Sequence, residues 1–229
     1  MKLSVLSVVD HYPERSRSVA GFYSEMLAQA ELADQLGYRA FFVAEHHFHE
    51  YGAVPNPALF LAAVAQRTKR ILLGPAVAIL PFANPRTTAE DYAMLDTLSG
   101  GRLVLGTGSG YLKHEFGGYG LDPADKRERF DENLEIVQRL LAGERLTFHG
   151  KFHRLDDVAI NVLPIQQRLP VYLAILRKEI AYSVGKSGKR IFTVPYGSLG
   201  GFDELAPLVA DFARGYRESG APPAPHGLG

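Results

Sequence analysis

Short apolar runs alternate with longer amphipathic segments along most of this chain, and this alternation restricts the folds open to it. The apolar runs are nearly continuous, which is typical of strands covered on both faces of a sheet. Repeated strand–helix units favour parallel strands joined by right-handed crossovers. The predicted strands are Leu3–Val9, Ala40–Ala44, Ile71–Leu80, Leu103–Leu105, Val171–Ile175 and Ile191–Val194.

The segments between the predicted strands carry helix signals. One apolar stripe, with residues at three- and four-residue steps, consists of Phe22, Met26, Ala30 and Ala33. Its helix is expected to end at Gly37, and another begins behind Asn56, a good N-cap followed by proline. The stretch 147–168 does not continue the alternation of strands and helices. We interpret it as a small hairpin excursion that turns near Gly150.

This pattern predicts an α/β fold of the TIM type, in which outer helices surround a (β/α) barrel of parallel strands. A complete barrel of eight units usually needs about 250 residues, whereas the chain has 229. We therefore predict an incomplete barrel of about six βα units. It forms a single domain over residues 1–229, with the excursion at 147–168. Missing units would leave two sheet edges uncovered. A homodimer, which we expect, or a folded remainder outside this sequence would be needed to cover them.

Composition excludes several classes of function. Lys+Arg and Asp+Glu both number 25, so no basic field is available for a phosphodiester backbone and no nucleic-acid partner is predicted. The absence of cysteine excludes disulfides, thiolate metal sites and cysteine nucleophiles. No apolar stretch approaches the roughly 18 residues of a membrane span. We expect a cytoplasmic protein without a membrane partner.

The densest polar cluster, Ala44-Glu45-His46-His47-Phe48-His49-Glu50, directly follows the second predicted strand. In a parallel barrel this position faces the mouth, where the carboxyl ends of the strands meet. Neutral imidazoles accept and donate protons near pH 7, so His46 and His47 are candidate catalytic residues. Hydrogen-bonded caps of the barrel end remain an alternative. A metal site is a weaker one, because adjacent histidines on extended chain point apart, and no metal is predicted.

A second candidate is the glycine-rich sequence Gly106-Thr107-Gly108-Ser109-Gly110-Tyr111, which follows the fourth predicted strand. Glycine at every second position lets the backbone approach a ligand closely and frees N–H groups for anions. A simple glycine-rich turn is the alternative. The spacing matches neither a dinucleotide-binding fingerprint nor a Walker A motif.

Charged residues supply the remaining candidates. Arg177 follows the strand Val171–Ile175 at the start of a helix, where a guanidinium can bind phosphate. Arg127 is a second such candidate in a charge-rich segment, and solvated surface charge is the alternative for both. Asp96 and Arg102 lie at the opposite end of the barrel, where we expect a structural ion pair.

In order and spacing, these motifs resemble the bacterial luciferase-like monooxygenases over roughly residues 1–195. The motifs that carry the resemblance are Ala44-Glu45-His46-His47-Phe48, Ile79-Leu80-Pro81-x-x-Asn84-Pro85, Leu95-Asp96-x-Leu98-Ser99-x-Gly101-Arg102, Gly106-x-Gly108-x-Gly110-Tyr111 with Glu115-Phe116, and Arg127-x-Arg129-Phe130-x-Glu132.

The resemblance implies an FMN-dependent monooxygenase. Such enzymes use reduced, dissociable FMN from a separate flavin reductase to activate O₂ for attack on a small organic substrate. His46 corresponds to the acid/base histidine of the family and His47 to its neighbour. The implied cofactor-binding residues are Ala76 and Val77, joined by a cis peptide bond beneath the flavin, Ser109, Arg127 and Arg177 at the phosphate, and Asn84, Gly108, Gly110 and Tyr111.

The chain also departs from luciferase itself. Asn84 stands where luciferase has histidine, Gly108 where it has cysteine and Leu176 where it has glutamate, which puts light emission in doubt. Three alternatives remain: a non-catalytic flavin-binding protein, a deazaflavin-dependent oxidoreductase, and a metal-dependent hydrolase using His46, His47 and His49. The paired histidines favour the monooxygenase over the deazaflavin enzyme, whereas the missing C-terminal units favour the non-catalytic relative.

Overall fold

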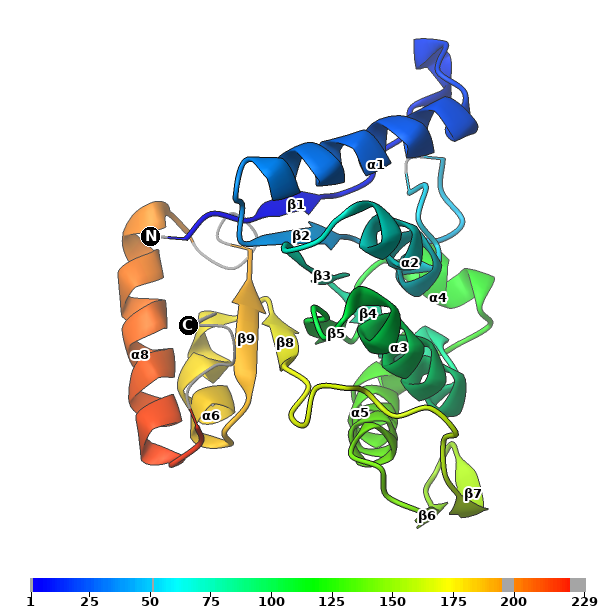
Figure 1. Cartoon of the computed structure of the whole chain (residues 1–229). Coiled ribbons are helices and arrows are strands. Elements are labelled where there is room, and N and C mark those ends of the chain that lie inside the picture. The colour runs from blue at the N-terminus through cyan, green and yellow to red at the C-terminus, as the bar shows by residue number, and fades with distance from the viewer. Residues whose placement is uncertain (1, 51, 195–199, 223–229) are drawn as a thin grey trace.

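The structure, a computed structural model, describes residues 2–50, 52–194 and 200–222. Its parallel strands follow one another in chain order around a curved sheet (Figure 1). These strands are β1 (Val5–Ser7), β2 (Ala40–Val43), β3 (Leu72–Pro75), β4 (Ala78–Ile79), β5 (Leu105–Gly108), β8 (Val171–Ile175) and β9 (Arg190–Thr193).

Two details join these strands into a single sheet. β3 and β4 are successive pieces of one strand, interrupted at Ala76 and Val77, and Leu73 of β3 forms a parallel bridge with Leu103 just before β5. The neighbouring strands are all parallel, which confirms the predicted α/β barrel class. Among the described residues, β1 pairs only with β2 and β9 only with β8. The barrel is therefore open, as predicted for an incomplete one.

The helices lie outside the sheet. They are α1 (Val19–Gln35), α2 (Pro57–Arg67), α3 (Pro85–Ser99), α4 (Lys113–Gly118), α5 (Lys126–Leu141), α6 (Ala181–Lys186) and α8 (Leu205–Glu218). Figure 1 shows α2, α3 and α5 on one side of the sheet, and α6 and α8 packed together beyond β9. None of the helices in the described ranges is long and apolar enough to cross a membrane.

Local sequence explains where the helices begin and which face they bury. The Asn56 side chain accepts a hydrogen bond from the backbone N–H of Leu59, and Pro57 occupies the first turn of α2. In α1, the predicted stripe that starts at Phe22 and Met26 is buried. Burying each large apolar side chain of this kind contributes roughly 2 kcal/mol. The chain leaves α1 through Gly37, whose φ of +78° suits glycine.

The apolar runs of the central strands are continuous because β2 and β3 are buried on both faces. In β2, Phe41 and Val43 contribute to the core beneath the helices, while Ala40 and Phe42 contribute to a second cluster with Val104 and Tyr172. This second cluster includes Phe192 of β9, whose ring stacks on Tyr172 and meets the Phe42 ring edge-on, with 5.2 Å between centroids. Because β2 and β9 are not neighbours in the sheet, the contact shows how strongly it curls.

The excursion is an antiparallel hairpin of β6 (Leu146–His149) and β7 (Arg154–Val158), as predicted. Glu132 of α5 holds its turn, because its carboxylate accepts from the backbone N–H groups of Lys151, Phe152 and His153. The predicted boundaries of β5 are wrong. β5 begins at Leu105 and continues to Gly108, so the first glycines of the glycine-rich sequence lie within the strand and not in a turn after it.

Candidate active site

A buried carboxylate joins the end of β2 to the helix that follows β5. Glu115 of α4 is 1% exposed, and its Oε1 lies 3.1 Å from Nδ1 of His46. The same oxygen accepts a hydrogen bond from the backbone N–H of His47 at 2.9 Å. Both histidines are themselves buried, at 8% and 7% exposure. A single carboxylate therefore fixes the predicted catalytic pair at the mouth.

The ring of His47 has partners of its own. Its Nε2 lies 2.8 Å from Oε1 of Glu45, and its Nδ1 lies 3.1 Å from the hydroxyl of Tyr119. The other oxygen of Glu45 accepts from the backbone N–H of Ile79 in β4. Burial, followed by the charges of Glu45 and Glu115, raises the pKa of Tyr119, so its hydroxyl keeps its proton at neutral pH.

The interruption between β3 and β4 lies beside this network. The peptide bond between Ala76 and Val77 is cis, as the resemblance implied. These two residues are partly exposed, whereas the residues of β3 and β4 on either side are buried. The interruption therefore exposes a small apolar step, formed by Ala76 and Val77, in a strand that is otherwise buried.

The glycines of the glycine-rich sequence are explained by packing within the protein. A Cβ atom at Gly106 would overlap the backbone oxygen of Pro75, and one at Gly108 would overlap the Val77 side chain. Gly110 has a φ of +72°, which favours glycine. Close packing of β5 against the strand beside it accounts for Gly106 and Gly108, and a backbone turn accounts for Gly110.

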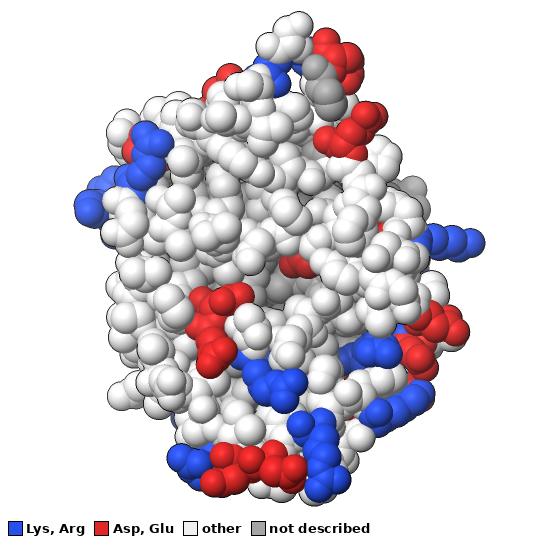
Figure 2. Space-filling model, turned by 90° about the vertical axis from the view of Figure 1, so that its right-hand side faces the viewer, with Lys and Arg blue, Asp and Glu red and all other residues white. Residues whose placement is uncertain are grey.

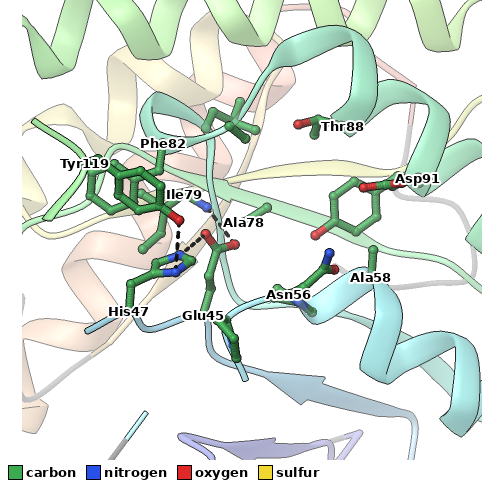
Figure 3. A pocket seen from close by; sticks show the side chains of 15 residues that line it. Glu45, His47, Asn56, Ala58, Ala78, Ile79, Phe82, Thr88, Asp91 and Tyr119 are labelled. Atoms are coloured by element: carbon green, nitrogen blue, oxygen red, sulfur yellow. Dashed lines mark hydrogen bonds and ion pairs between the residues drawn. The ribbon is translucent and has the colours of Figure 1, made fainter. Parts of the chain in front are cut away.

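His47 lines a cavity of about 160 Å³. In Figure 3, Glu45 and Tyr119 lie on the same side of this cavity as His47, and Asn56, Thr88 and Asp91 lie on the other. Burial, with the charge of Glu90, raises the pKa of Asp91. Pockets for drug-sized ligands usually measure about 300–1,000 Å³. The cavity has room for a few water molecules or a small group, and it is too small for a flavin ring system.

The open face of the mouth is broader than this cavity. In Figure 1 the arrowheads of β1 and β2 point to the right, and Figure 2 shows that side of the molecule, hollowed near its centre with an acidic side chain visible in the hollow. Ser109, directly after β5, is partly buried, and Arg177 is exposed two residues after β8. Within the described ranges, the Arg177 guanidinium has no hydrogen bond or ion pair.

The remaining predicted cofactor residues are more peripheral. Asn84 is exposed and caps α3, accepting from the backbone N–H of Arg86. Tyr111 is 61% exposed. Arg127 lies within α5, where its guanidinium pairs with Asp131 at 2.7 Å on the outer surface of the helix. None of its described contacts joins it to His46, Ser109 or Arg177.

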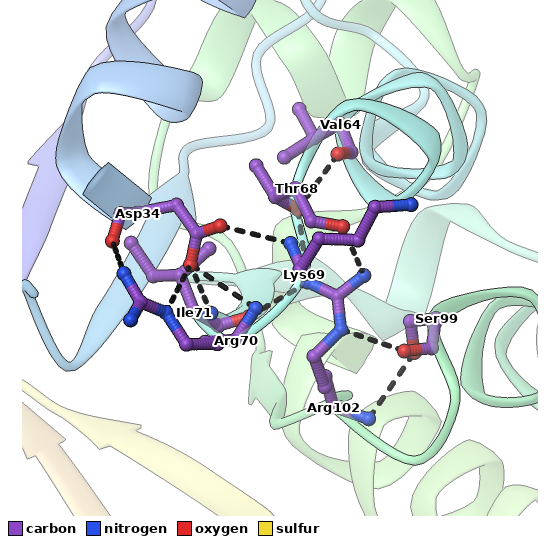
Figure 4. A network of polar contacts seen from close by, with 8 residues as sticks. All are labelled: Asp34, Val64, Thr68, Lys69, Arg70, Ile71, Ser99 and Arg102. Carbon is purple, nitrogen blue, oxygen red and sulfur yellow. Dashed lines mark hydrogen bonds and ion pairs between the residues drawn. The ribbon is translucent and has the colours of Figure 1, made fainter.

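The opposite, N-terminal ends of the strands carry a different polar network (Figure 4). The guanidinium of Arg102 donates to the backbone oxygens of Ala65, Ile71 and Ser99, among others. The predicted ion pair between Arg102 and Asp96 is wrong, because no such pair exists among the described residues. Asp96 instead accepts from the backbone and side chain of Gln166. Asp96 and Arg102 therefore both have a structural role, as expected, but each bonds to other partners than the predicted one.

Sequence reasoning missed the partners of the histidines. Glu45 lies inside the polar cluster, but nothing in its spacing distinguishes it from its neighbours. Glu115 and Tyr119 lie about 70 residues further along the chain, at separations of 69 and 72 from His46 and His47 respectively. One signal in the sequence could have indicated the partner of His46. Glu115 is an acidic residue directly before the apolar Phe116, in a short helix at the mouth.

Parallel strands with titratable side chains at their carboxyl ends define the α/β-barrel class, in which active sites lie at this end of the barrel. Among the described residues, no group of three or more His, Asp or Glu side chains is arranged to hold a metal ion. The family model of luciferase-like monooxygenases matches residues 1–227, and the chain belongs to this family.

The similar proteins include two classes of oxidoreductase. The chain is 34% identical over 180 residues to limonene 1,2-monooxygenase of Rhodococcus erythropolis, a match that covers 79% of this chain and 46% of the relative. It is 31% identical over 197 residues to an F420-dependent glucose-6-phosphate dehydrogenase of Amycolatopsis mediterranei, covering 82% and 59%. The chain therefore spans about half the length of these curated relatives.

Solved structures agree with the fold. Monooxygenase RslO1 from Streptomyces bottropensis superposes with a TM-score of 0.89 at 31% identity, covering 98% of this chain and 68% of that one. The oxygenating constituent of 3,6-diketocamphane monooxygenase from Pseudomonas putida, solved in complex with FMN, gives a TM-score of 0.81 at 21% identity, covering 97% and 64%. At that lower identity the likeness concerns the fold alone.

Proposed function

We propose that this chain binds reduced FMN at the mouth of its barrel and belongs to a two-component monooxygenase that acts on a small organic substrate. A separate flavin reductase supplies the reduced cofactor. The observation that carries the proposal is the position of His46, Ser109 and Arg177, each of which follows a parallel strand at the same edge of the sheet. Side chains at the carboxyl ends of parallel strands form the active sites of such barrels.

The residues present fit a flavin. Ala76 and Val77 form a partly exposed apolar step against which a flat ring system can lie. Arg177 offers an exposed guanidinium, the group best suited to bind a phosphate in bidentate fashion. Ser109 supplies a hydroxyl and a backbone N–H after β5. The sequence also proposed Asn84, Gly108, Gly110 and Tyr111. It proposed Arg127 as well, whose guanidinium pairs with Asp131 on α5.

When bound, reduced FMN supplies the electrons and activates O₂. The residues of the chain bind and orient it, exclude water, and move protons. His46 exchanges a proton with the bound ligand, since imidazole does so near neutral pH. His47 was predicted as a second catalytic residue, and its buried contacts with Glu45 and Tyr119 support a role in holding the loop after β2.

A deazaflavin-dependent oxidoreductase is the second candidate. The 31% identity to an F420-dependent dehydrogenase over 82% of this chain favours it specifically. Parallel titrations with FMN, reduced FMN and F420, followed by fluorescence and calorimetry, separate the two candidates. We expect saturable binding of reduced FMN and weaker binding of F420. Tight binding of F420 alone would replace the proposal with the second candidate.

Two substitutions test the site. Arg177→Ala should weaken FMN binding roughly 10-fold through loss of a charge-assisted phosphate contact, whereas Arg145→Ala, an exposed arginine paired with Asp157, should not change it. His46→Ala should slow O₂-dependent substrate oxidation more than it weakens FMN binding. Full activity in that variant would remove His46 from the reaction.

We also propose that the protein acts in the cytoplasm as a homodimer that covers the open edges of the sheet. Leu6 of β1 is 51% exposed, which leaves apolar surface at this edge. Sedimentation equilibrium measures the assembly directly. A monomer at all concentrations would contradict this part of the proposal.

A further inference from the structure

We infer that Glu115 is a positioning residue that keeps the proton of His46 on Nδ1, while Glu45 keeps the proton of His47 on the opposite ring nitrogen, Nε2. The adjacent histidines would then differ in the ring nitrogen that carries the lone pair, which is Nε2 in His46 and Nδ1 in His47. The inference deepens the proposed function and rests on it for the role of the His46 lone pair toward a bound ligand. The positions of the ring protons follow from contacts within this chain.

The contact of His46 determines its tautomer. A carboxylate oxygen only accepts hydrogen bonds, so the hydrogen between Glu115 Oε1 and His46 Nδ1 must belong to the ring. In a neutral imidazole, one nitrogen donates and the other accepts. Nε2 of His46 is therefore the nitrogen with the lone pair, which is the one able to take up a proton.

The contacts of His47 determine the opposite arrangement. Glu45 accepts with both oxygens, from Nε2 of His47 and from the backbone N–H of Ile79. The hydroxyl of Tyr119 then donates to Nδ1 of His47. Both ring nitrogens of His47 are engaged with side chains that are themselves held in place, so the ring is fixed and its lone pair is used.

Glu115 has a further property that Glu45 lacks. Its second oxygen, Oε2, is buried and has no hydrogen-bond partner among the described residues. Its described hydrogen bonds therefore all involve Oε1, which contacts the His46 ring and the backbone N–H of His47. Glu115 thus orients the ring, as in other carboxylate–histidine pairs.

The test is solution NMR of the flavin-free chain with ¹⁵N-labelled histidine, because the shift of each ring nitrogen shows whether it carries a proton. His46→Asn and His47→Asn spectra assign the two rings. We expect His46 to be protonated on Nδ1 and His47 on Nε2 at a pH where both are neutral. His46 protonated on Nε2, or His47 on Nδ1, would overturn the inference.

A matched pair of substitutions then tests each carboxylate. In Glu115→Leu the Nδ1–H signal of His46 should be lost while His47 keeps its Nε2–H. In Glu45→Leu the His47 ring should change and His46 should not. An unchanged His46 ring in a folded Glu115→Leu variant would also overturn the inference. If either leucine variant fails to fold, the wild-type spectrum still decides the question.

The outcome is separable from that of the proposed function. The spectra are recorded without flavin, so a failure to bind FMN would sink the proposed function and leave the ring protons as observed. Conversely, FMN binding with the opposite tautomers would retain the function and reject the roles given to Glu115 and Glu45.

Discussion

At the N-terminal ends of the strands, Asp34 and Arg102 bond mainly to the backbone. The Asp34 carboxylate accepts from the N–H groups of Lys69, Arg70 and Ile71, and Arg102 donates chiefly to backbone oxygens. At the carboxyl ends, titratable side chains bond to one another as well as to the backbone: His46 contacts Glu115, and His47 contacts Glu45 and Tyr119. Both regions are compact polar networks, but their partners differ in kind.

This difference separates the polar residues that stabilise this fold from the polar residues that are candidates for function. Side chains that bond to backbone groups hold turns in place. At the mouth, by contrast, Oε2 of Glu115 is buried without a hydrogen-bond partner among the described residues. Substitutions at the N-terminal ends should therefore cost stability, and those at the mouth should change proton positions and ligand binding.

The largest effect is expected from Arg102→Ala. This change leaves several buried backbone oxygens without donors, so we expect the free energy of unfolding to fall by roughly 3 kcal/mol. Urea unfolding followed by circular dichroism measures it. Arg145→Ala, which removes an exposed ion pair, is the control and should cost less than about 0.5 kcal/mol. Equal losses in the two variants would break the comparison.

Asp34→Asn should have the next largest effect, about 2 kcal/mol, because charge-assisted hydrogen bonds to three backbone N–H groups are weakened. Burial raises the pKa of Asp34, but these hydrogen bonds outweigh it and hold the pKa below 3.8 in the folded state. The stabilisation is thus complete above the unfolded value and is lost as the pH falls through the folded one.

Unfolding at pH 7 and at pH 3 checks this linkage. The difference in stability between wild type and Asp34→Asn should shrink at the lower pH. A difference that stays constant across this range would show that the Asp34 carboxylate is not held by its backbone hydrogen bonds.

At the mouth, Glu115→Gln should change the free energy of unfolding by less than about 1 kcal/mol. The stability lost with the charge-assisted hydrogen bonds is offset, because folding of the variant no longer has to desolvate a buried charge. The same urea assay applies. A loss as large as that of Arg102→Ala would make Glu115 a structural residue and remove the contrast between the two regions.

Tyr119→Phe should have the smallest effect, roughly 0.5 kcal/mol, since it removes one hydrogen bond from a partly exposed side chain. Its ring contacts with Phe82 and His47 remain possible. Thermal unfolding measures the change, and the ¹⁵N ring spectrum should alter at His47 only. An altered His46 ring would show that the two histidines are coupled.

The sequence was informative where the signal was local. Val171–Ile175 is a strand with the predicted bounds, because continuous apolar sequence between turn residues is unambiguous. The β5 boundary was wrong because Gly106 and Gly108 resemble turn residues, although close strand packing requires them. Long-range partners could not be predicted. The acid that binds His46 is 69 residues away, and Arg102 bonds to backbone oxygens that have no sequence signature.

The most direct test of a flavin site at the mouth is NMR mapping of reduced FMN binding under anaerobic conditions. We expect saturable shifts at the His46 ring and at the backbone amides of Ser109 and Arg177, with no shift at the amides of Lys69 to Ile71 beneath Asp34. Saturable shifts confined to the N-terminal ends of the strands, or none at the mouth, would contradict the account.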